Sequence, residues 1–168
     1  MTTHVLFEGA PGVLVRTDEL VVEGVGRAEL IDAARRAAPA ADRIELCGGI
    51  GVDDAASVIA VVGDSADVRL NRYGFESLEQ VAAYKVAFGT GEVGDAAFFY
   101  ATAQSTPLVQ HEGVMVAGVA DERVLIERTR EAQARGAGII ELYGGLGARA
   151  AATVRQVTDD ALPVGFID

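Results

Sequence analysis

Apolar runs alternate with stretches of helical spacing along the first half of the chain. Strand-length apolar runs occur at about 4–7, 20–25, 43–47 and 66–71, and helical spacing occurs at about 28–38 and 53–62. The second half repeats the pattern, with strands expected at about 96–101, 114–119, 138–143 and 163–167 and helices at about 121–134 and 148–158. Each half thus has the order β-β-α-β-α-β, which favours an α/β fold with mainly parallel strands.

A further amphipathic segment at 76–88 lies between the two halves. It is apolar at Leu78, Val81 and Val86, and the following Gly89-Thr90-Gly91 supplies an end signal. We expect a helix that joins the halves. The sequence therefore predicts a first repeat with its linking helix at 1–91 and a second repeat at 92–168, which together form one compact domain.

The two halves share residues as well as element order. With a shift of 96 residues, the string that begins Ile44-Glu45-Leu46 falls on the string that begins Ile140-Glu141-Leu142, and nine of the fifteen pairs over positions 44–58 are identical. Shared composition alone does not explain so many identities. The sequence therefore indicates an internal duplication, with the halves related by a pseudo-twofold axis.

Eight strands from two similar halves are compatible with more than one architecture. One is an eight-stranded, barrel-like sheet similar to a TIM barrel, although 168 residues are fewer than the roughly 200 of a complete barrel. The alternatives are an open sheet made of two half-sheets, or two α/β units side by side. Periodicity does not choose among them.

Two strings of the first half resemble those of a small bacterial domain family of unknown function. They are Glu45-Leu46-Cys47-Gly48-Gly49-Ile50-Gly51 and Arg72-Tyr73-Gly74-Phe75-Glu76-Ser77-Leu78-Glu79. Members of that family are often single units of about half this length, so the resemblance implies a fused tandem pair over nearly all of the chain. It implies a fold and no chemistry. The second half departs from it by carrying Tyr143 at the position of Cys47.

Charge bears on the classes of partner that are expected. The chain has 25 acidic and 14 basic residues, a formal charge of −11. Such a field repels phosphate backbones and anionic membrane surfaces, so neither nucleic acid nor a membrane is an expected partner. Every long apolar run is interrupted by charged residues. A small-molecule ligand and a homo-oligomer both remain compatible with the sequence.

Few residues of the chain are typical of redox or metal chemistry. Cys47 is the lone cysteine, and the start of the sequence lacks a basic segment followed by an apolar core, so we expect a cytoplasmic protein. His4 and His111 have no second ligand at local metal-binding spacing. We therefore expect no metal site, and the sequence identifies no cofactor.

A Gly-Gly-x-Gly turn follows a strand and precedes a helix in each half. Glycines permit a close approach of the backbone, and the first N–H groups of a helix are unpaired, which together favour an anion. The candidate ligand-binding residues of the two turns are Gly48, Gly49, Gly144, Gly145, Gly147 and Arg149. The alternative is a tight turn that needs no ligand.

The residues that follow the two turns differ in charge. Asp53 and Asp54 open the first helix, where they suit capping and repel an anion, whereas Arg149 lies in the first turn of the second helix. We therefore expect the second turn to bind an anion better than the first.

Two acids lie within the apolar strands that end at these turns. Strand alternation places Glu45 on the same side as Cys47, and Glu141 on the same side as Tyr143. A desolvated carboxylate near the end of a strand is suited to act as a general base, or it can pair with Arg69 on the neighbouring strand. The structural alternative is a carboxylate that braces the turn.

Two classes of function follow from these features. The first is a small enzyme of the isomerase or lyase kind, which transfers a proton on an anionic or carbonyl-bearing metabolite with Glu45 or Glu141 as base. The second is a non-catalytic ligand-binding module or an oligomeric assembly module.

Overall fold

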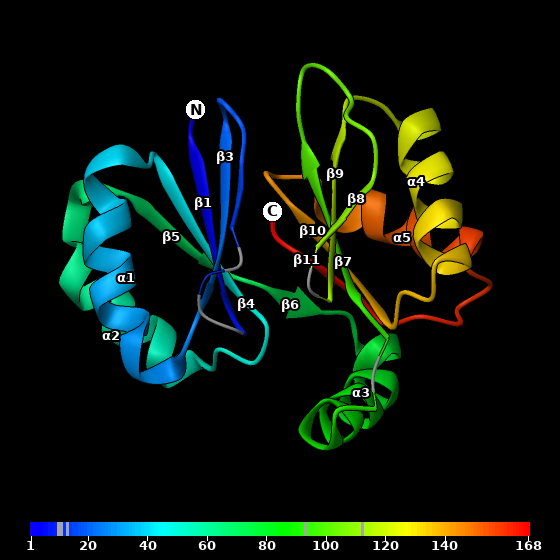
Figure 1. The fold of residues 1–168 in the computed structure, drawn as a ribbon, viewed down its shortest axis with the longest axis horizontal. Coiled ribbons are helices and arrows are strands. Elements are labelled where there is room, and N and C mark those ends of the chain that lie inside the picture. The colour runs from blue at the N-terminus through cyan, green and yellow to red at the C-terminus, as the bar shows by residue number, and fades with distance from the viewer. Residues whose placement is uncertain (10–11, 13, 93, 112) are drawn as a thin grey trace. The chain divides into compact units, whose positions relative to one another are not determined.

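The chain forms two compact α/β units, residues 1–71 and residues 72–168 (Figure 1). The computed structural model describes residues 1–9, 12, 14–92, 94–111 and 113–168. Each unit has its own mainly parallel sheet. The described strands therefore do not close into one eight-stranded, barrel-like sheet. Short antiparallel strands occupy three of the four sheet edges. They hydrogen-bond to the backbone N–H and C=O groups that would otherwise be open for pairing in a closed barrel.

Unit 1 contains a sheet of order β2-β3-β1-β4-β5. Its strands are β1 (Thr3–Glu8), β2 (Leu14–Arg16), β3 (Leu20–Val25), β4 (Arg43–Cys47) and β5 (Asp67–Leu70). All pairs are parallel except β2 with β3. The helices α1 (Leu30–Ala37) and α2 (Val52–Val62) cover one face of this sheet, where Leu6, Ile44 and Leu46 contribute to the core (Figure 1).

Unit 2 contains a sheet of order β6-β11-β10-β7-β9-β8. Its strands are β6 (Arg72–Tyr73), β7 (Ala96–Ala101), β8 (Val109–His111), β9 (Val114–Val119), β10 (Ile139–Tyr143) and β11 (Val164–Phe166). The helices α4 (Glu122–Ala134) and α5 (Gly147–Val157) cover one face of this sheet. The side chain of Asp121 caps α4 by accepting the Val124 N–H at 2.9 Å.

The helix expected between the halves is α3 (Leu78–Thr90), and it belongs to unit 2. The Gln80 side chain donates to the carbonyl of Asp160 at 2.6 Å, and β6, which precedes the helix, pairs with β11. The boundary between the units therefore lies at 71/72. The segment 72–91, which the sequence assigns to the first repeat, belongs to unit 2.

Both sheets have the same strand order when β6 is set aside. The order β2-β3-β1-β4-β5 of unit 1 corresponds to β8-β9-β7-β10-β11 of unit 2. The registers also correspond, because Val5 pairs with Val22 and Glu45, while Phe98 pairs with Val116 and Glu141. Glu45 and Glu141 therefore occupy the same register position in their sheets.

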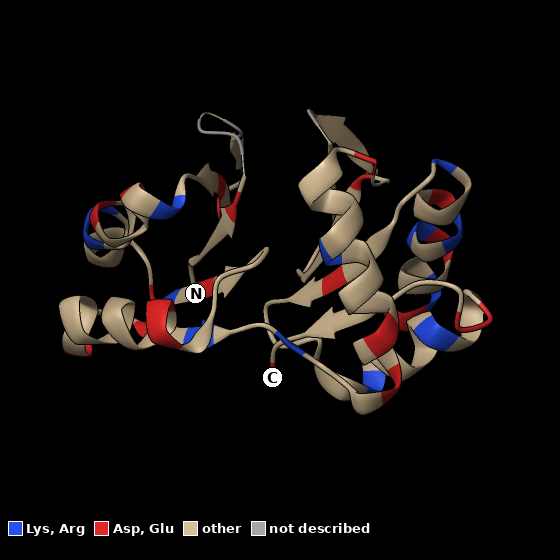
Figure 2. Ribbon diagram, turned by 90° about the horizontal axis from the view of Figure 1, so that it is seen from below, with Lys and Arg blue, Asp and Glu red and all other residues tan. Residues whose placement is uncertain are grey.

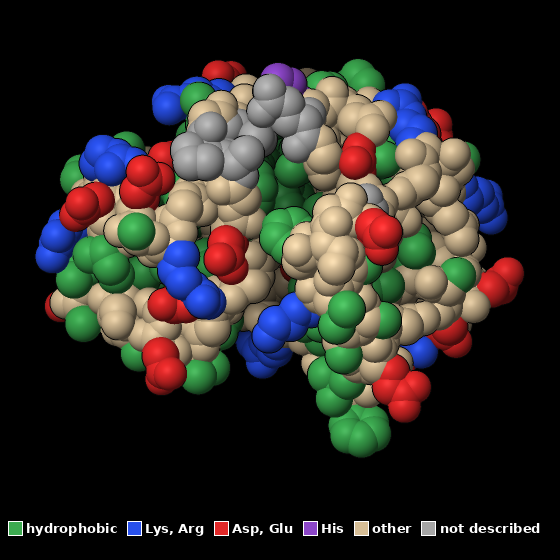
Figure 3. Space-filling model, turned by 60° about the horizontal axis from the view of Figure 1, so that its bottom comes forward, with side chains coloured by type: hydrophobic (Ala, Val, Ile, Leu, Met, Phe, Trp, Pro, Cys, Tyr) green, Lys and Arg blue, Asp and Glu red, His purple; other side chains and the backbone are tan. Residues whose placement is uncertain are grey.

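The surfaces of the helices differ in character. Figure 2 shows both signs of charge on α4, where Arg128 and Arg135 pair with Glu131. On α3, by contrast, Val86 and Phe88 are 72% and 54% exposed, and Figure 3 shows hydrophobic side chains gathered along this helix. None of the helices in the described part of the chain combines the length and apolar character needed to cross a membrane.

Candidate functional site

The buried acid of unit 2 is held by two tyrosine hydroxyls. Glu141 on β10 is 2% exposed. Its Oε1 accepts a hydrogen bond from the Tyr73 hydroxyl at 2.5 Å, and its Oε2 accepts one from the Tyr143 hydroxyl at 2.6 Å. Each carboxylate oxygen therefore has a neutral donor, and such donors stabilise the ionised form without removing its charge.

The position of Tyr73 follows from the sheet. Tyr73 lies on the edge strand β6 opposite Gly165 of β11, and Gly165 in turn lies opposite Glu141 of β10. Because Gly165 has no side chain, the phenol can cross this strand and reach the carboxylate. Tyr73 is only partly buried. It therefore links the buried carboxylate to a more exposed part of unit 2.

A third tyrosine is electrostatically coupled to the same carboxylate. Tyr84 on α3 donates to the carbonyl of Gly94 at 3.3 Å. Burial, and then the charges of Glu141 and Asp95, raise the pKa of Tyr84 to about 12. Tyr84 therefore stays protonated at neutral pH. We name Glu141, Tyr73, Tyr84 and Tyr143 the tyrosine cluster.

The corresponding acid of unit 1 has a cationic partner. Glu45 is fully buried, and its Oε1 accepts from Arg43 Nη1 at 3.1 Å on the same strand. Arg69 lies opposite Glu45 in the register of β5, and its Nε binds Asp67 Oδ2 at 2.8 Å. Glu45 thus has a cation as a partner and Glu141 has two hydroxyls, although the two acids share a register position.

The two glycine turns have closely similar conformations at their first two residues. The φ values are +63° and +93° at Gly48 and Gly49, and +67° and +83° at Gly144 and Gly145. A Cβ at Gly48 or Gly144 would also lie only 3.1–3.2 Å from a backbone nitrogen of the adjacent strand. Both turns therefore require glycine for conformation and space.

The charges around the turns are more balanced than the adjacent sequence indicates. At the first turn, Arg27 Nη2 donates to the carbonyl of Gly49 and pairs with Asp54 Oδ2, both at 3.2 Å. At the second turn, the Gly147 N–H donates to the carbonyl of Ile167 at 3.2 Å, and the Asp168 carboxylate lies beside Gly147. Sequence reasoning missed Arg27 and Asp168, because neither is near its turn along the chain.

Arg149 is the cation that remains available near the second turn. Arg149 is exposed, and among the described residues no carboxylate forms an ion pair with its guanidinium. Gly145 is exposed as well. The second turn therefore retains a backbone segment and a cation that can meet an anion, although Asp168 opposes one.

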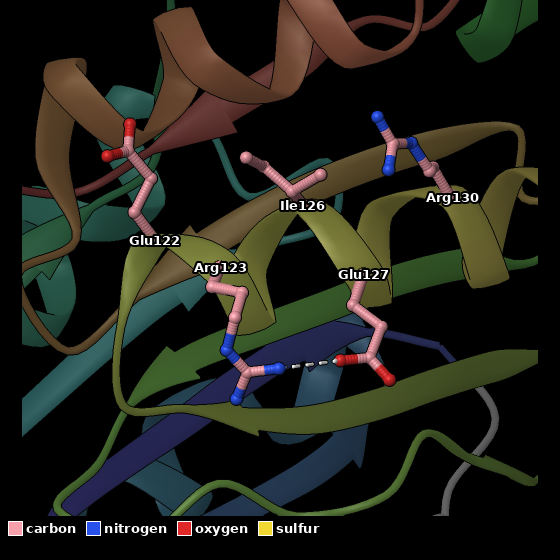
Figure 4. A pocket seen from close by; sticks show the side chains of 5 residues that line it. All are labelled: Glu122, Arg123, Ile126, Glu127 and Arg130. Carbon is pink, nitrogen blue, oxygen red and sulfur yellow. Dashed lines mark ion pairs between the residues drawn. The ribbon is translucent and has the colours of Figure 1, made fainter.

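A surface hollow on α4 contains none of these residues. A cavity of about 490 Å³ is lined by five residues of α4 (Figure 4). Arg123 Nη1 lies 3.5 Å from Glu127 Oε2, and a dashed line marks this ion pair in Figure 4. All of its lining side chains come from one helix, so no polar groups converge from a second element. Within the described ranges, no three His, Cys, Asp or Glu side chains are grouped as metal ligands.

A family model matches part of unit 2. Residues 96–168 match a family of unknown function (DUF6506). The matched region runs from β7 to the end of the sequence and contains Glu141, Tyr143 and the second turn. None of the curated proteins and none of the solved structures matches the chain.

The match supports an uncharacterised domain and assigns no chemistry. The sequence resemblance rested on 45–51 and 72–79, whereas the DUF6506 match covers the second half. The structure unites Tyr73, which lies in the second of those strings, with Glu141, 68 residues away. The one sequence signal for the tyrosine cluster is the spacing of Glu141 and Tyr143, which places both side chains on one face of a strand.

Proposed function

We propose that the chain binds a small anionic or carbonyl-bearing metabolite in unit 2 and that Glu141 transfers a proton on it, in a reaction of the isomerase or lyase kind. The observation that carries this proposal is the pair of tyrosine hydroxyls on the two oxygens of the buried Glu141 carboxylate. They keep a desolvated carboxylate oriented while leaving its charge in place, as a general base requires.

The proton transfer would proceed as follows. A Glu141 oxygen takes the proton from a carbon next to the substrate carbonyl. The electron pair of the broken C–H bond forms the C=C bond of an enolate, and the carbonyl oxygen becomes negative. We assign the stabilisation of this charge to the N–H of Gly145 and the guanidinium of Arg149. The proton then returns to another atom of the substrate, or leaves through the Tyr73 hydroxyl.

Glu45 has a different role in this proposal. Its ion pair with Arg43 at 3.1 Å in a buried setting supports a structural role, as an ion pair within β4 and not as a brace of the turn. We therefore assign proton transfer to Glu141 alone, and we assign Gly48, Gly49 and Arg69 to the structure of unit 1.

Proton exchange with solvent tests the proposal. Wild-type protein is incubated in D₂O with a panel of 2-oxo and 3-oxo carboxylic acids, and loss of each α-proton signal is followed by NMR. We expect faster loss for at least one acid, and an exchange rate that falls by about 100-fold or more in Glu141→Gln, as is typical for loss of a general base. Gln keeps a carbonyl oxygen that one tyrosine can still use, so this variant should fold.

Two control variants accompany this test. Glu45→Gln changes the acid at the same register position in unit 1, and Glu79→Gln removes an exposed acid of α3. With either variant, the exchange rate should stay within about threefold of the wild-type rate. This is a much smaller change than the one expected when a general base is removed. A wild-type protein that accelerates no exchange, or a Glu141→Gln variant as active as wild type, contradicts the proposal. The first outcome favours a non-catalytic binding or assembly module.

We further propose that the two units are copies of one ancestral unit. The identical strings around Glu45 and Glu141, the common strand order and the matched registers support this duplication. The charge of −11 supports the absence of a nucleic-acid partner. A bacterial origin, a cytoplasmic location and a homo-oligomer stay part of the proposal.

A further inference from the structure

A second cavity lies in unit 1, and Glu45 is not among the residues that line it. It has a volume of about 460 Å³ and is bordered by β1, β2, β3 and the end of α1. This volume lies within the range of sites that hold small molecules. Its apolar wall includes Leu14, Val21 and Ala37, and its polar wall includes four ionisable side chains from four different elements. We call it the His4 cavity.

The polar wall contains a histidine, a glutamate and two arginines. His4 Nε2 lies 2.9 Å from Glu23 Oε2, and Arg36 Nη2 lies 3.4 Å from Glu23 Oε1. Arg16 also borders the cavity, and in the described part of the chain its guanidinium forms no ion pair. With a neutral histidine, two cations and one carboxylate leave the wall with one net positive charge. This contrasts with the −11 of the whole chain.

Burial, opposed by the hydrogen bond and charge of Glu23, lowers the pKa of His4 below its usual 6.5. The imidazole is therefore neutral at pH 7, and its Nε2–H donates to the Glu23 carboxylate. Arg16 and Arg36 act in the same direction as burial, since both disfavour a further positive charge. The cavity thus holds more positive charge than its one carboxylate balances.

The sheet of unit 2 has no polar residues at the positions that correspond to His4 and Glu23. Ala97 and Ala117 occupy the register positions of His4 and Glu23, and both are fully buried in an apolar core with Met115. The same place in the same kind of sheet is therefore filled by small apolar side chains. His4 and Glu23 are extra polar groups in unit 1, and the fold alone does not account for them.

We propose that the His4 cavity binds a small organic carboxylate, with the anion on Arg16 and Arg36 and the apolar body against Leu14, Val21 and Ala37. A single negative charge matches the single excess positive charge of the wall. A dianion such as phosphate is disfavoured by Glu23 and has no apolar body for the rest of the cavity. The site is independent of Glu141 and of the proposed proton transfer.

Calorimetric titration with benzoate tests this proposal, with benzamide as the neutral probe of the same shape. We expect one benzoate to bind per chain, benzamide to bind at least tenfold more weakly, and Arg16→Gln to weaken benzoate at least tenfold. Arg130→Gln is the matched control because it also removes one exposed arginine, from α4 in unit 2, and it should leave the affinity unchanged. Arg16 is exposed, so its variant should fold, and the unfolding midpoint checks this.

Several results would overturn the His4 cavity as a carboxylate site. These are no heat with benzoate, equal affinity for benzoate and benzamide, or equal affinity in wild type and Arg16→Gln. Loss of binding in Arg149→Gln instead of Arg16→Gln would place the anion at the second turn and reject this location. Binding that persists in Glu141→Gln is expected, and it keeps this test separate from the exchange assay.

Discussion

Glu45 and Glu141 show how one residue in one register position acquires two environments. The strings that surround them share nine of fifteen residues, so the sequence predicts acids in equivalent places near the ends of their strands, and both are buried. Their partners differ because the residues near them on the same strand differ and because another strand supplies a partner to Glu141. Arg43 stands two residues before Glu45, whereas Ile139 stands at that position before Glu141. Tyr73 is 68 residues from Glu141 and is delivered only by the pairing of β6 with β11.

The ion pair of Arg43 with Glu45 leads to a stability prediction. Arg43→Leu leaves a buried carboxylate without this partner, which typically costs about 3–5 kcal/mol of unfolding free energy. The double variant Arg43→Leu/Glu45→Leu should recover much of the loss, because no charge remains buried. Urea unfolding measures both. Arg69→Leu, which removes a half-exposed ion pair, is the control and should cost about 1 kcal/mol or less. Equal losses in Arg43→Leu and Arg69→Leu would argue against a structural role for the pair.

His4 leads to a prediction about pH. Its pKa is lowered in the folded protein by burial, so the unfolded chain binds a proton more readily as the pH falls below about 6.5. The stability that His4 contributes is therefore present above pH 6.5 and declines as the pH falls from 6.5 towards the lowered pKa. We expect the loss of melting temperature between pH 7.5 and pH 5.5 to be smaller in His4→Gln than in wild type. An equal loss in the two proteins would contradict this assignment.

At the scale of elements, the longer segments were predictable, and three of the shortest strands were not. The predicted helix at 121–134 is α4 at Glu122–Ala134, because its buried face recurs with helical spacing. By contrast, β2, β6 and β8 contain only two or three residues each, too few to show alternation. Pairing with a neighbour defines these strands, and β6 is the one that brings Tyr73 to Glu141.

The glycine turns give a prediction at this scale. Gly144→Ala places a Cβ at a φ of +67° and 3.2 Å from the Ala101 nitrogen, so we expect a loss of about 1–3 kcal/mol in unfolding free energy. Gly89→Ala in α3 is the matched control, because a Cβ there meets nothing within 4 Å. It should be neutral or stabilise the protein by up to about 1 kcal/mol. Similar effects of both substitutions would show that the turn does not require glycine.

At the scale of the whole molecule, the common element order of the two halves was predictable from the sequence, and the division of the strands between two sheets was not. A pattern of apolar runs is the same for a barrel, an open sheet or two units, since edges are set by hydrogen bonding between strands. The segment 72–91 joins unit 2 through β6 and through the contact of Gln80 with the Asp160 carbonyl. No local signal predicts such partners, and the same holds for Arg27 and Asp168 at the turns.

The central claim is that Glu141 in unit 2 transfers a proton. Its most direct test is the rate of deuterium exchange on the oxo-acid that wild type accelerates, compared in Glu141→Gln and Arg16→Gln. Glu141→Gln should lower the rate by about 100-fold or more. Arg16→Gln changes only the His4 cavity of unit 1, so its rate should stay within about twofold of the wild-type rate. A change of that size is too small to reflect the loss of a catalytic group. A Glu141→Gln variant that exchanges as fast as wild type, or a wild type that accelerates exchange of none of the acids, would contradict the claim.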